Sequence, residues 1–230
     1  VLKWAKKRQL LEVNVLSDIY AKEDLGIERN RGTRFLSDEE IKMVLMAIEE
    51  SNILPKNKIF LKLCLMFGCR NGELRKAKKT DFDLKRKVWV VPVVNNKTGK
   101  KTGREIIRPI LPEMEALIIE AFEYSTCEYF LTNDSEETPM SHGSSNSLPG
   151  YVMERLRKHH DYHMKHWSLH DLRRTARTNF SAFTSRDVAQ LMIGHVMSGE
   201  QGTYDYYEYL PQQTEAYAKW LDKIKSLTNN

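Results

Sequence analysis

Two short segments of this chain have the β-branched, apolar character of strands, Val88–Val94 and Ile106–Ile110. The residues between them, Asn95–Gly103, are polar and include glycine, which favours a β-hairpin with a long tip. The other patterned segments have apolar residues at the spacing of helices. We therefore predict a mainly α-helical fold with a small antiparallel β-sheet, in the α+β class.

Capping signals delimit the predicted helices. Ser37 is followed by Glu40 in a Ser-x-x-Glu capping box, which is typical of a helix N-terminus. Gly68 directly follows an apolar helical segment and is expected to end it. The polar segment Thr132–Ser147 predicts a loop. The predicted helices are Ser37–Ser51, Lys56–Phe67, Pro112–Tyr124, Tyr151–Asp161, Leu169–Phe183, Arg186–Met192 and Pro211–Leu227.

The N-terminal segment is patterned separately from the rest of the chain. Residues 1–19 predict a helix, and its apolar residues favour one face: Leu2, Ala5, Leu10 and Leu11. Residues 20–33 are polar, contain glycine and predict a linker. The alternative is an ordinary N-terminal helix of the same domain. Because the chain begins at Val1 without a methionine, we expect it to be a fragment of a longer protein.

The charge distribution indicates an anionic partner. The net charge is +5 and the isoelectric point is near 9.0. Basic residues crowd positions 76–79, 85–87, 97–108, 155–158 and 173–177, whereas acidic residues gather at 38–40, 49–50 and 136–137. This asymmetry favours one basic face, of the kind that binds nucleic acid.

The composition argues against a membrane protein. Charged residues make up 29% of the chain, and the mean hydropathy is −0.55. No apolar run approaches the roughly 20 residues that a bilayer requires, and the charged N-terminus lacks the apolar region of a signal peptide. The three cysteines form no CxxC pair, which fits a reducing compartment. We expect a soluble, cytoplasmic protein.

Basic and histidine side chains recur in an order that suits phosphodiester cleavage. A phosphate under attack gathers negative charge, and guanidinium groups match its geometry with paired hydrogen bonds. A tyrosine among such groups is a candidate covalent nucleophile. His170 and Arg173 share a helix face near an N-terminus, where the helix dipole favours an anion. The candidate catalytic residues are Arg70, Lys97, His170, Arg173, His195 and Tyr204.

These residues carry a family resemblance. From about Arg34 to the C-terminus, the chain resembles the catalytic domain of tyrosine recombinases of the lambda-integrase family. Within that family it is most similar to integrases of satellite prophages and genomic islands, which are mobile genetic elements. The motifs are Arg70 in FGCRNGEL, Lys97 in NNKTGK, His170 and Arg173 in LHDLRRT, His195 in IGHV, and Tyr204 in TYDYYEYLPQQTEAYAKWLD.

The resemblance implies a site-specific DNA recombinase that cleaves and rejoins strands through a 3′-phosphotyrosyl intermediate. Tyr204 would be the nucleophile, and Lys97 would protonate the leaving 5′ oxygen. His170 would assist proton loss from the tyrosine, while His195 and the two arginines would contact the phosphate. Glu73 would orient Arg70. The chemistry implied needs no metal and no nucleotide cofactor.

Domain organisation and partners are implied in the same way. Residues 1–19 would be the C-terminal remnant of a core-DNA-binding domain, residues 20–33 a linker, and residues 34–230 the catalytic domain. The partner would be double-stranded DNA at core recombination sites, bound by a homotetramer in the synapse and by a monomer in isolation. Contacts to DNA are expected from Lys76, Lys78, Lys79, Lys100, Lys101, Arg104, Arg174 and Arg177.

The sequence leaves several alternatives open. Lys100 and Lys101 compete with the proposed lysine, and Tyr206, Tyr207 and Tyr209 compete with the proposed nucleophile. The run KHHDYHMKHW places four histidines at helical spacings, so a metal site is possible on spacing alone. The rival functions are a type IB topoisomerase-like enzyme and a non-catalytic DNA-binding protein.

Overall fold

The computed structural model describes residues 1–20, 23–26, 32–97, 99–133, 137–195 and 209–229. The chain divides into two compact units, Val1–Thr33 and Arg34–Asn230. In the described part of the chain, no helix has both the length and the apolar character needed to span a membrane.

The first unit contains one short helix, α1 (Leu2–Lys7). The prediction of a helix over residues 1–19 is therefore wrong beyond Lys7. Gln9 has a left-handed backbone with φ of 59°, which stops the helix. Leu10, Val13 and Leu16 are exposed, so no packing rewards a longer helix, and short helices depend on such packing.

The second unit contains the predicted mixture of helices and a small sheet. Its helices are α2 (Asp38–Glu50), α3 (Pro55–Phe67), α4 (Asn71–Arg75), η1 (Lys79–Asp81), α5 (Gly99–Thr102), α6 (Pro112–Glu123), α7 (His142–His160), α8 (Leu169–Phe183), α9 (Arg186–Met192) and α11 (Leu210–Thr228). Its strands are β1 (Phe82–Asp83), β2 (Val88–Val91) and β3 (Ile106–Pro109), in the antiparallel order β1-β2-β3. The fold class is thereby confirmed.

Helix α7 begins at His142, well before the predicted start at Tyr151. The last part of the predicted loop, from His142 to Ser147, is therefore helical, and the loop prediction is wrong there. The Ser141 hydroxyl caps the helix by accepting a hydrogen bond from the Ser144 backbone at 2.9 Å. Buried Leu148 then outweighs the weak helix propensity of the serine-rich segment.

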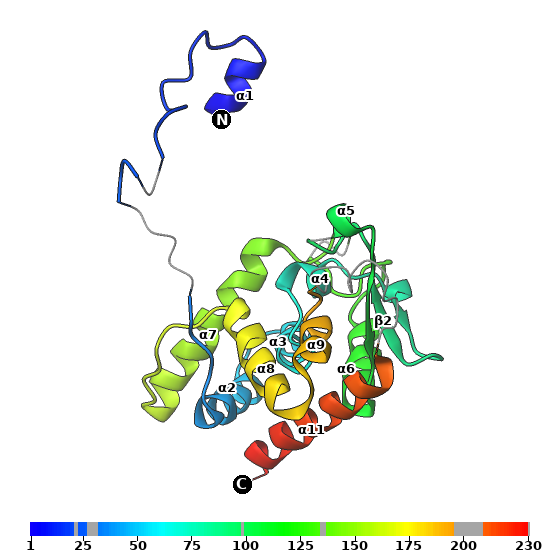
Figure 1. Ribbon diagram of the computed structural model, residues 1–230. Coiled ribbons are helices and arrows are strands. Elements are labelled where there is room, and N and C mark those ends of the chain that lie inside the picture. Colours follow the sequence, from blue (N-terminus) through cyan, green and yellow to red (C-terminus); the bar gives the residue numbers. More distant parts are fainter. Residues whose placement is uncertain (21–22, 27–31, 98, 134–136, 196–208, 230) are drawn as a thin grey trace. The chain divides into compact units, whose positions relative to one another are not determined.

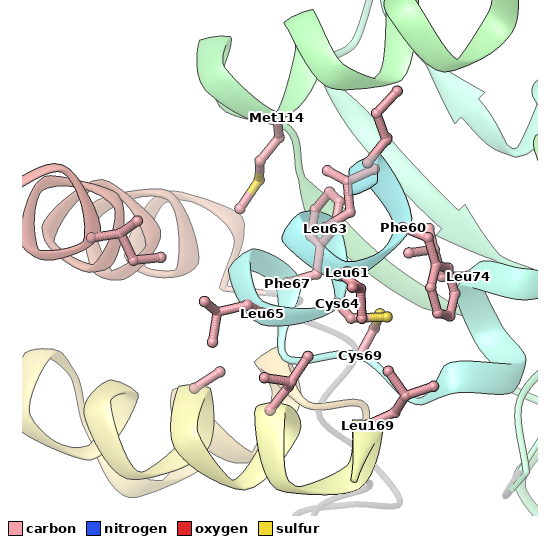
Figure 2. Close-up of a cluster of buried hydrophobic side chains, with 14 of the residues drawn as sticks. Phe60, Leu61, Leu63, Cys64, Leu65, Phe67, Cys69, Leu74, Met114 and Leu169 are labelled. Atoms are coloured by element: carbon pink, nitrogen blue, oxygen red, sulfur yellow. The ribbon is translucent and has the colours of Figure 1, made fainter. Parts of the chain in front are cut away.

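Helix α3 forms the centre of the second unit. It packs against α2, α6, α7, α8 and α11 (Figure 1). Figure 2 shows Met114 of α6 and Leu169 of α8 on opposite sides of α3, which has buried side chains around its surface. Cys64 is one of them, as expected for a cysteine that packs in a core.

The C-terminal end of α3 is held by hydrogen bonds from α11. Trp220 Nε1 of α11 donates to the Leu65 carbonyl at 3.2 Å, and the Tyr217 hydroxyl donates to the Phe67 carbonyl at 3.1 Å. Gly68 ends the helix with φ of 59°. A Cβ at this glycine would lie 2.8 Å from the Ala176 Cβ, so only glycine allows α8 to approach so closely.

Candidate active site

The turn after α3 places Arg70 at the N-cap of α4. Arg70 Nη1 donates to Glu73 Oε1 at 2.6 Å and to the Gly194 carbonyl at 3.4 Å. The side chain is 19% exposed, so it remains partly accessible to solvent. The predicted role of Glu73 in orienting Arg70 agrees with this geometry.

Glu73 is shared by two arginines. Arg108 Nη2 donates to Glu73 Oε2 at 2.9 Å, while Arg70 contacts the other carboxylate oxygen. Glu73 and Arg108 are almost completely buried. Burial opposes ionisation of Glu73, but the charges of Arg108, Arg70 and Arg173 outweigh it and lower the pKa of the carboxyl.

Arg173 reaches the same site from α8. Its Nη1 donates to the Gly68 carbonyl at 3.1 Å, which ties α8 to the turn before Arg70. Arg173 is only 4% exposed. Burial and the nearby charge of Arg70 lower the pKa of Arg173 to about 10, so the group is still cationic at neutral pH. Among the described residues, its buried Nη2 has no hydrogen-bond partner.

His170 lies one turn before Arg173, near the N-terminus of α8. The Asp171 carboxylate accepts hydrogen bonds from the backbone N–H and the hydroxyl of Ser168, both at 2.8 Å, and this fixes the start of the helix. Desolvation and the charges of Arg174 and Arg173 lower the pKa of His170. The imidazole is therefore mainly neutral at pH 7 and can accept a proton.

His195 follows α9 and the turn at Gly194. Its Nδ1 lies 2.6 Å from Gln190 Oε1, and its backbone N–H donates to the Gln190 carbonyl at 2.9 Å. Desolvation and the charges of Arg173 and Arg70 lower the pKa of His195 to about 4. Because the contact with Gln190 favours a proton on Nδ1, Nε2 is left as an acceptor until a bound anion favours protonation.

Arg108 is a site residue that the sequence motifs did not predict. It lies in β3 with Ile106 on the same face of the strand, and both side chains are buried. An arginine at an inward position of an otherwise apolar strand is the signal that could have identified it, because a buried charge needs a partner.

The comparisons with known proteins agree with this geometry. A model of the phage integrase family matches residues 34–208, a range that contains every predicted catalytic residue. The chain belongs to the phage integrase family. The resemblance to tyrosine recombinases is thereby confirmed, and site-specific DNA recombination is the activity that this phage integrase shares with its family. No curated protein matches the sequence.

Solved structures of other integrases share the fold of this phage integrase. The Tn1549 transposon integrase, in complex with a circular-intermediate DNA, is 15% identical with a TM-score of 0.63, over 96% of this chain and 74% of that one. A lambda integrase dimer bound to a core site is 21% identical with a TM-score of 0.56, over 87% and 54%. The XerA recombinase is 16% identical with a TM-score of 0.54, over 95% and 73%.

The roles of two predicted residues rest on the sequence alone. Lys97 is exposed in the connection between β2 and β3. Tyr204 lies outside the described residues, as do its competitors Tyr206 and Tyr207. Their roles stay predictions.

The cations predicted to contact DNA are distributed over three regions. Lys76, Lys78 and Lys79 follow α4, and the last two are partly engaged: Lys78 pairs with Glu128 at 2.9 Å, and Lys79 donates to the Ser125 carbonyl at 2.5 Å. Lys100 and Lys101 belong to α5 in the hairpin tip, with Arg104 just after it. Arg174 pairs with Asp171, and Arg177 contacts the Ser181 hydroxyl, both on α8.

The histidine run does not assemble a metal site in the described residues. His160 Nε2 lies 2.8 Å from Glu50 Oε2, and His163 pairs with Asp161 at 3.3 Å. Across those residues, no three side chains of metal-ligating type gather at one place.

We expect acid to destabilise the free protein through His195. In the unfolded chain, histidine has a pKa of about 6.5. In the folded protein, the pKa of His195 is lowered to about 4, so its imidazole stays neutral until the pH approaches that value. Stability should therefore fall as the pH drops through this window. Thermal unfolding of the wild type and of His195→Asn at a series of pH values tests this. The variant should lose less stability, with His159→Asn on α7 as the control. Equal acid sensitivity in all three proteins would contradict the expectation.

Proposed function

We propose that this chain cuts and rejoins DNA at specific sites through a covalent bond to Tyr204. The phenolic oxygen attacks the scissile phosphorus, the bond to the 5′ oxygen breaks, and a 3′-phosphotyrosyl link forms. Attack by the freed 5′ hydroxyl of another strand reverses these steps, so rejoining consumes no nucleotide.

The observation that carries this proposal is a buried excess of positive charge with unused donors. Three guanidinium groups, Arg70, Arg108 and Arg173, surround one carboxylate, Glu73. Arg173 Nη2 is a buried donor without a partner among the described residues. Such donors favour an anion, and they stabilise best a phosphate that gains charge in the transition state.

The proton transfers fall to residues beside this cluster. Neutral His170 can accept the proton of the attacking tyrosine, because its lowered pKa keeps a ring nitrogen free. Lys97 can supply a proton to the leaving 5′ oxygen, provided that bound DNA draws the hairpin tip toward the site. His195 and the two arginines Arg70 and Arg173 then hold the non-bridging oxygens.

We further propose the organisation of the complex. Residues 1–19 belong to a second DNA-gripping domain, residues 20–33 link the two, and residues 34–230 form the catalytic domain. The lambda integrase, which shares the fold, has been described as a tetramer bound to a Holliday junction. A homotetramer on DNA is accordingly proposed here, in the bacterial cytoplasm, with the isolated chain as a monomer.

A nicked suicide substrate tests the function. Cleavage next to the nick releases a short fragment, so the covalent complex cannot religate and accumulates. We expect an adduct that survives denaturation and requires a specific duplex sequence. No adduct on any core-type duplex would favour a non-catalytic DNA-binding protein. Supercoil relaxation with no sequence preference would favour a type IB topoisomerase.

The cleavage step should also proceed in EDTA. The positive charge in the proposed site comes from arginine side chains, and the Glu73 carboxylate among them is already engaged by two of these arginines. Magnesium prefers carboxylate oxygens, so this cluster offers it little. Adduct formation with and without EDTA should be equally fast. A strict requirement for a divalent ion in the cleavage step would contradict the mechanism.

A further inference from the structure

Arg108 is a buried cation whose two hydrogen bonds both reach elements that position active-site residues. It is 0% exposed, although an arginine loses much favourable hydration on burial. It lies opposite Trp89 in the sheet, and its guanidinium carbon lies 5.1 Å from the centre of that ring. The indole therefore provides a flat apolar support beneath the charge.

The two remaining contacts of Arg108 lead in different directions. Nη2 donates to Glu73 Oε2 at 2.9 Å, on the carboxylate that also holds Arg70. Nε donates to the Met192 carbonyl at 2.8 Å, at the end of α9. One rigid guanidinium thus connects the short helix that positions Arg70 to the helix that leads to His195.

Gly194 shows how closely the turn before His195 approaches Arg108. Its φ is 67°, and a Cβ there would lie 2.5 Å from Ile106 Cδ1 and 3.1 Å from Arg108 Nη2. The Gly194 carbonyl in turn accepts the hydrogen bond from Arg70. The turn is therefore packed against β3 on one side and bonded to Arg70 on the other.

The contact with Glu73 also keeps Arg108 and Glu73 charged although both are buried. Although burial opposes its charge, Glu73 raises the pKa of Arg108, so both groups stay ionised. Because Glu73 divides its two oxygens between two arginines, it orients Arg70 without neutralising the whole cluster. The excess positive charge is left for an anion in the site.

We propose that Arg108 is a positioning residue for strand cleavage, one that fixes Glu73, and through it Arg70, together with the turn that presents His195. The inference rests on the proposed function, because its effect is measured on the cleavage reaction. Arg108 itself does not touch the DNA in this proposal. Its loss should therefore slow cleavage and leave DNA binding nearly unchanged.

The test compares Arg108→Met and Arg108→Lys with the wild type on the suicide substrate. Arg108→Met keeps an unbranched apolar stem but removes both hydrogen bonds. By analogy with residues that orient metal ligands, its loss should slow cleavage about 10–100-fold. Lysine restores the charge beside Glu73 and should recover part of the rate. Ile118→Ala, a core change in α6, is the control for lowered stability alone, with all rates measured well below each melting temperature.

A double-mutant cycle with Glu73→Gln tests the route through Glu73. If Arg108 acts through Glu73, Arg108→Met should cost less in the Glu73→Gln background than in the wild type. The inference is overturned if Arg108→Met cleaves at the wild-type rate, if Ile118→Ala slows cleavage equally, or if the two effects simply add. Failure of the proposed function is distinguishable, because the wild type would then form no adduct.

Discussion

The Tyr204→Phe variant should form no covalent adduct with DNA, although it should fold and bind DNA as the wild-type chain does. The substitution removes only the phenolic oxygen, which is the proposed nucleophile, and keeps the ring. No other step can compensate, because the strand break and the protein–DNA bond form together. Denaturing gels of the suicide-substrate reaction measure the adduct directly, and a filter-binding assay measures affinity.

Matched tyrosine variants make this result specific. Tyr206→Phe, Tyr207→Phe and Tyr209→Phe remove the same atom from the neighbouring candidates. Each of these three variants should still form the adduct, at a rate close to that of the wild type. An adduct that persists in Tyr204→Phe and disappears in one of the three would move the nucleophile to that residue.

Loss of either arginine should slow cleavage by about 100-fold or more, by analogy with removal of a single transition-state donor in other enzymes. Arg70→Ala removes the more exposed guanidinium, and Arg173→Lys keeps the charge of the buried one without its paired donors. Affinity for DNA should fall far less, because many other cations contact the backbone. Single-turnover cleavage rates at saturating protein separate the two effects.

Arg86→Ala is the matched control for these variants. Arg86 lies in the turn between β1 and β2, where its backbone N–H contacts Asp83, and it has no proposed role in the site. It should cleave at the wild-type rate. If Arg70→Ala and Arg173→Lys lose binding and cleavage in equal proportion, the arginines serve only as phosphate anchors.

The helix boundaries that the sequence predicted correctly are mostly marked by local capping signals. Ser37 and Glu40 form the expected capping box, with hydrogen bonds of 3.2 and 3.0 Å. Gly68 ends α3 where its sequence position predicts, and α8 and α9 span the expected residues. These signals act over a few residues, so a single sequence contains them.

The predictions of secondary structure were wrong where contacts between distant parts of the chain determine whether a helix or strand forms. The N-terminal half of α7 has a poor helical sequence and depends on the burial of Leu148 and Ser145. Strand β1 is two residues long and is defined by its pairing with β2, which is distant information that two residues cannot carry. In the first unit, the apolar pattern of residues 1–19 favours a longer helix than the structure has. Its apolar side chains beyond Lys7, such as Leu10 and Val13, are exposed, so no packing stabilises that helix.

The candidate site also contains residues that short motifs predict and one that depends on a distant contact. The motifs predicted that Arg70, Glu73, His170, Arg173 and His195 act together, and the structure brings these five into one electrostatic cluster. Arg108 belongs to no motif, because its importance comes from a contact with Glu73 across the fold. Spacing along a chain does not encode such a contact.

Mass spectrometry of the trapped adduct tests the central claim most directly. After protease and nuclease digestion, fragmentation of the modified peptide identifies the residue that carries the nucleotide and the end through which it is attached. The proposed mechanism predicts a nucleotide joined to Tyr204 through its 3′ phosphate. A nucleotide on Tyr206 or Tyr207, or a link through a 5′ phosphate, would contradict it.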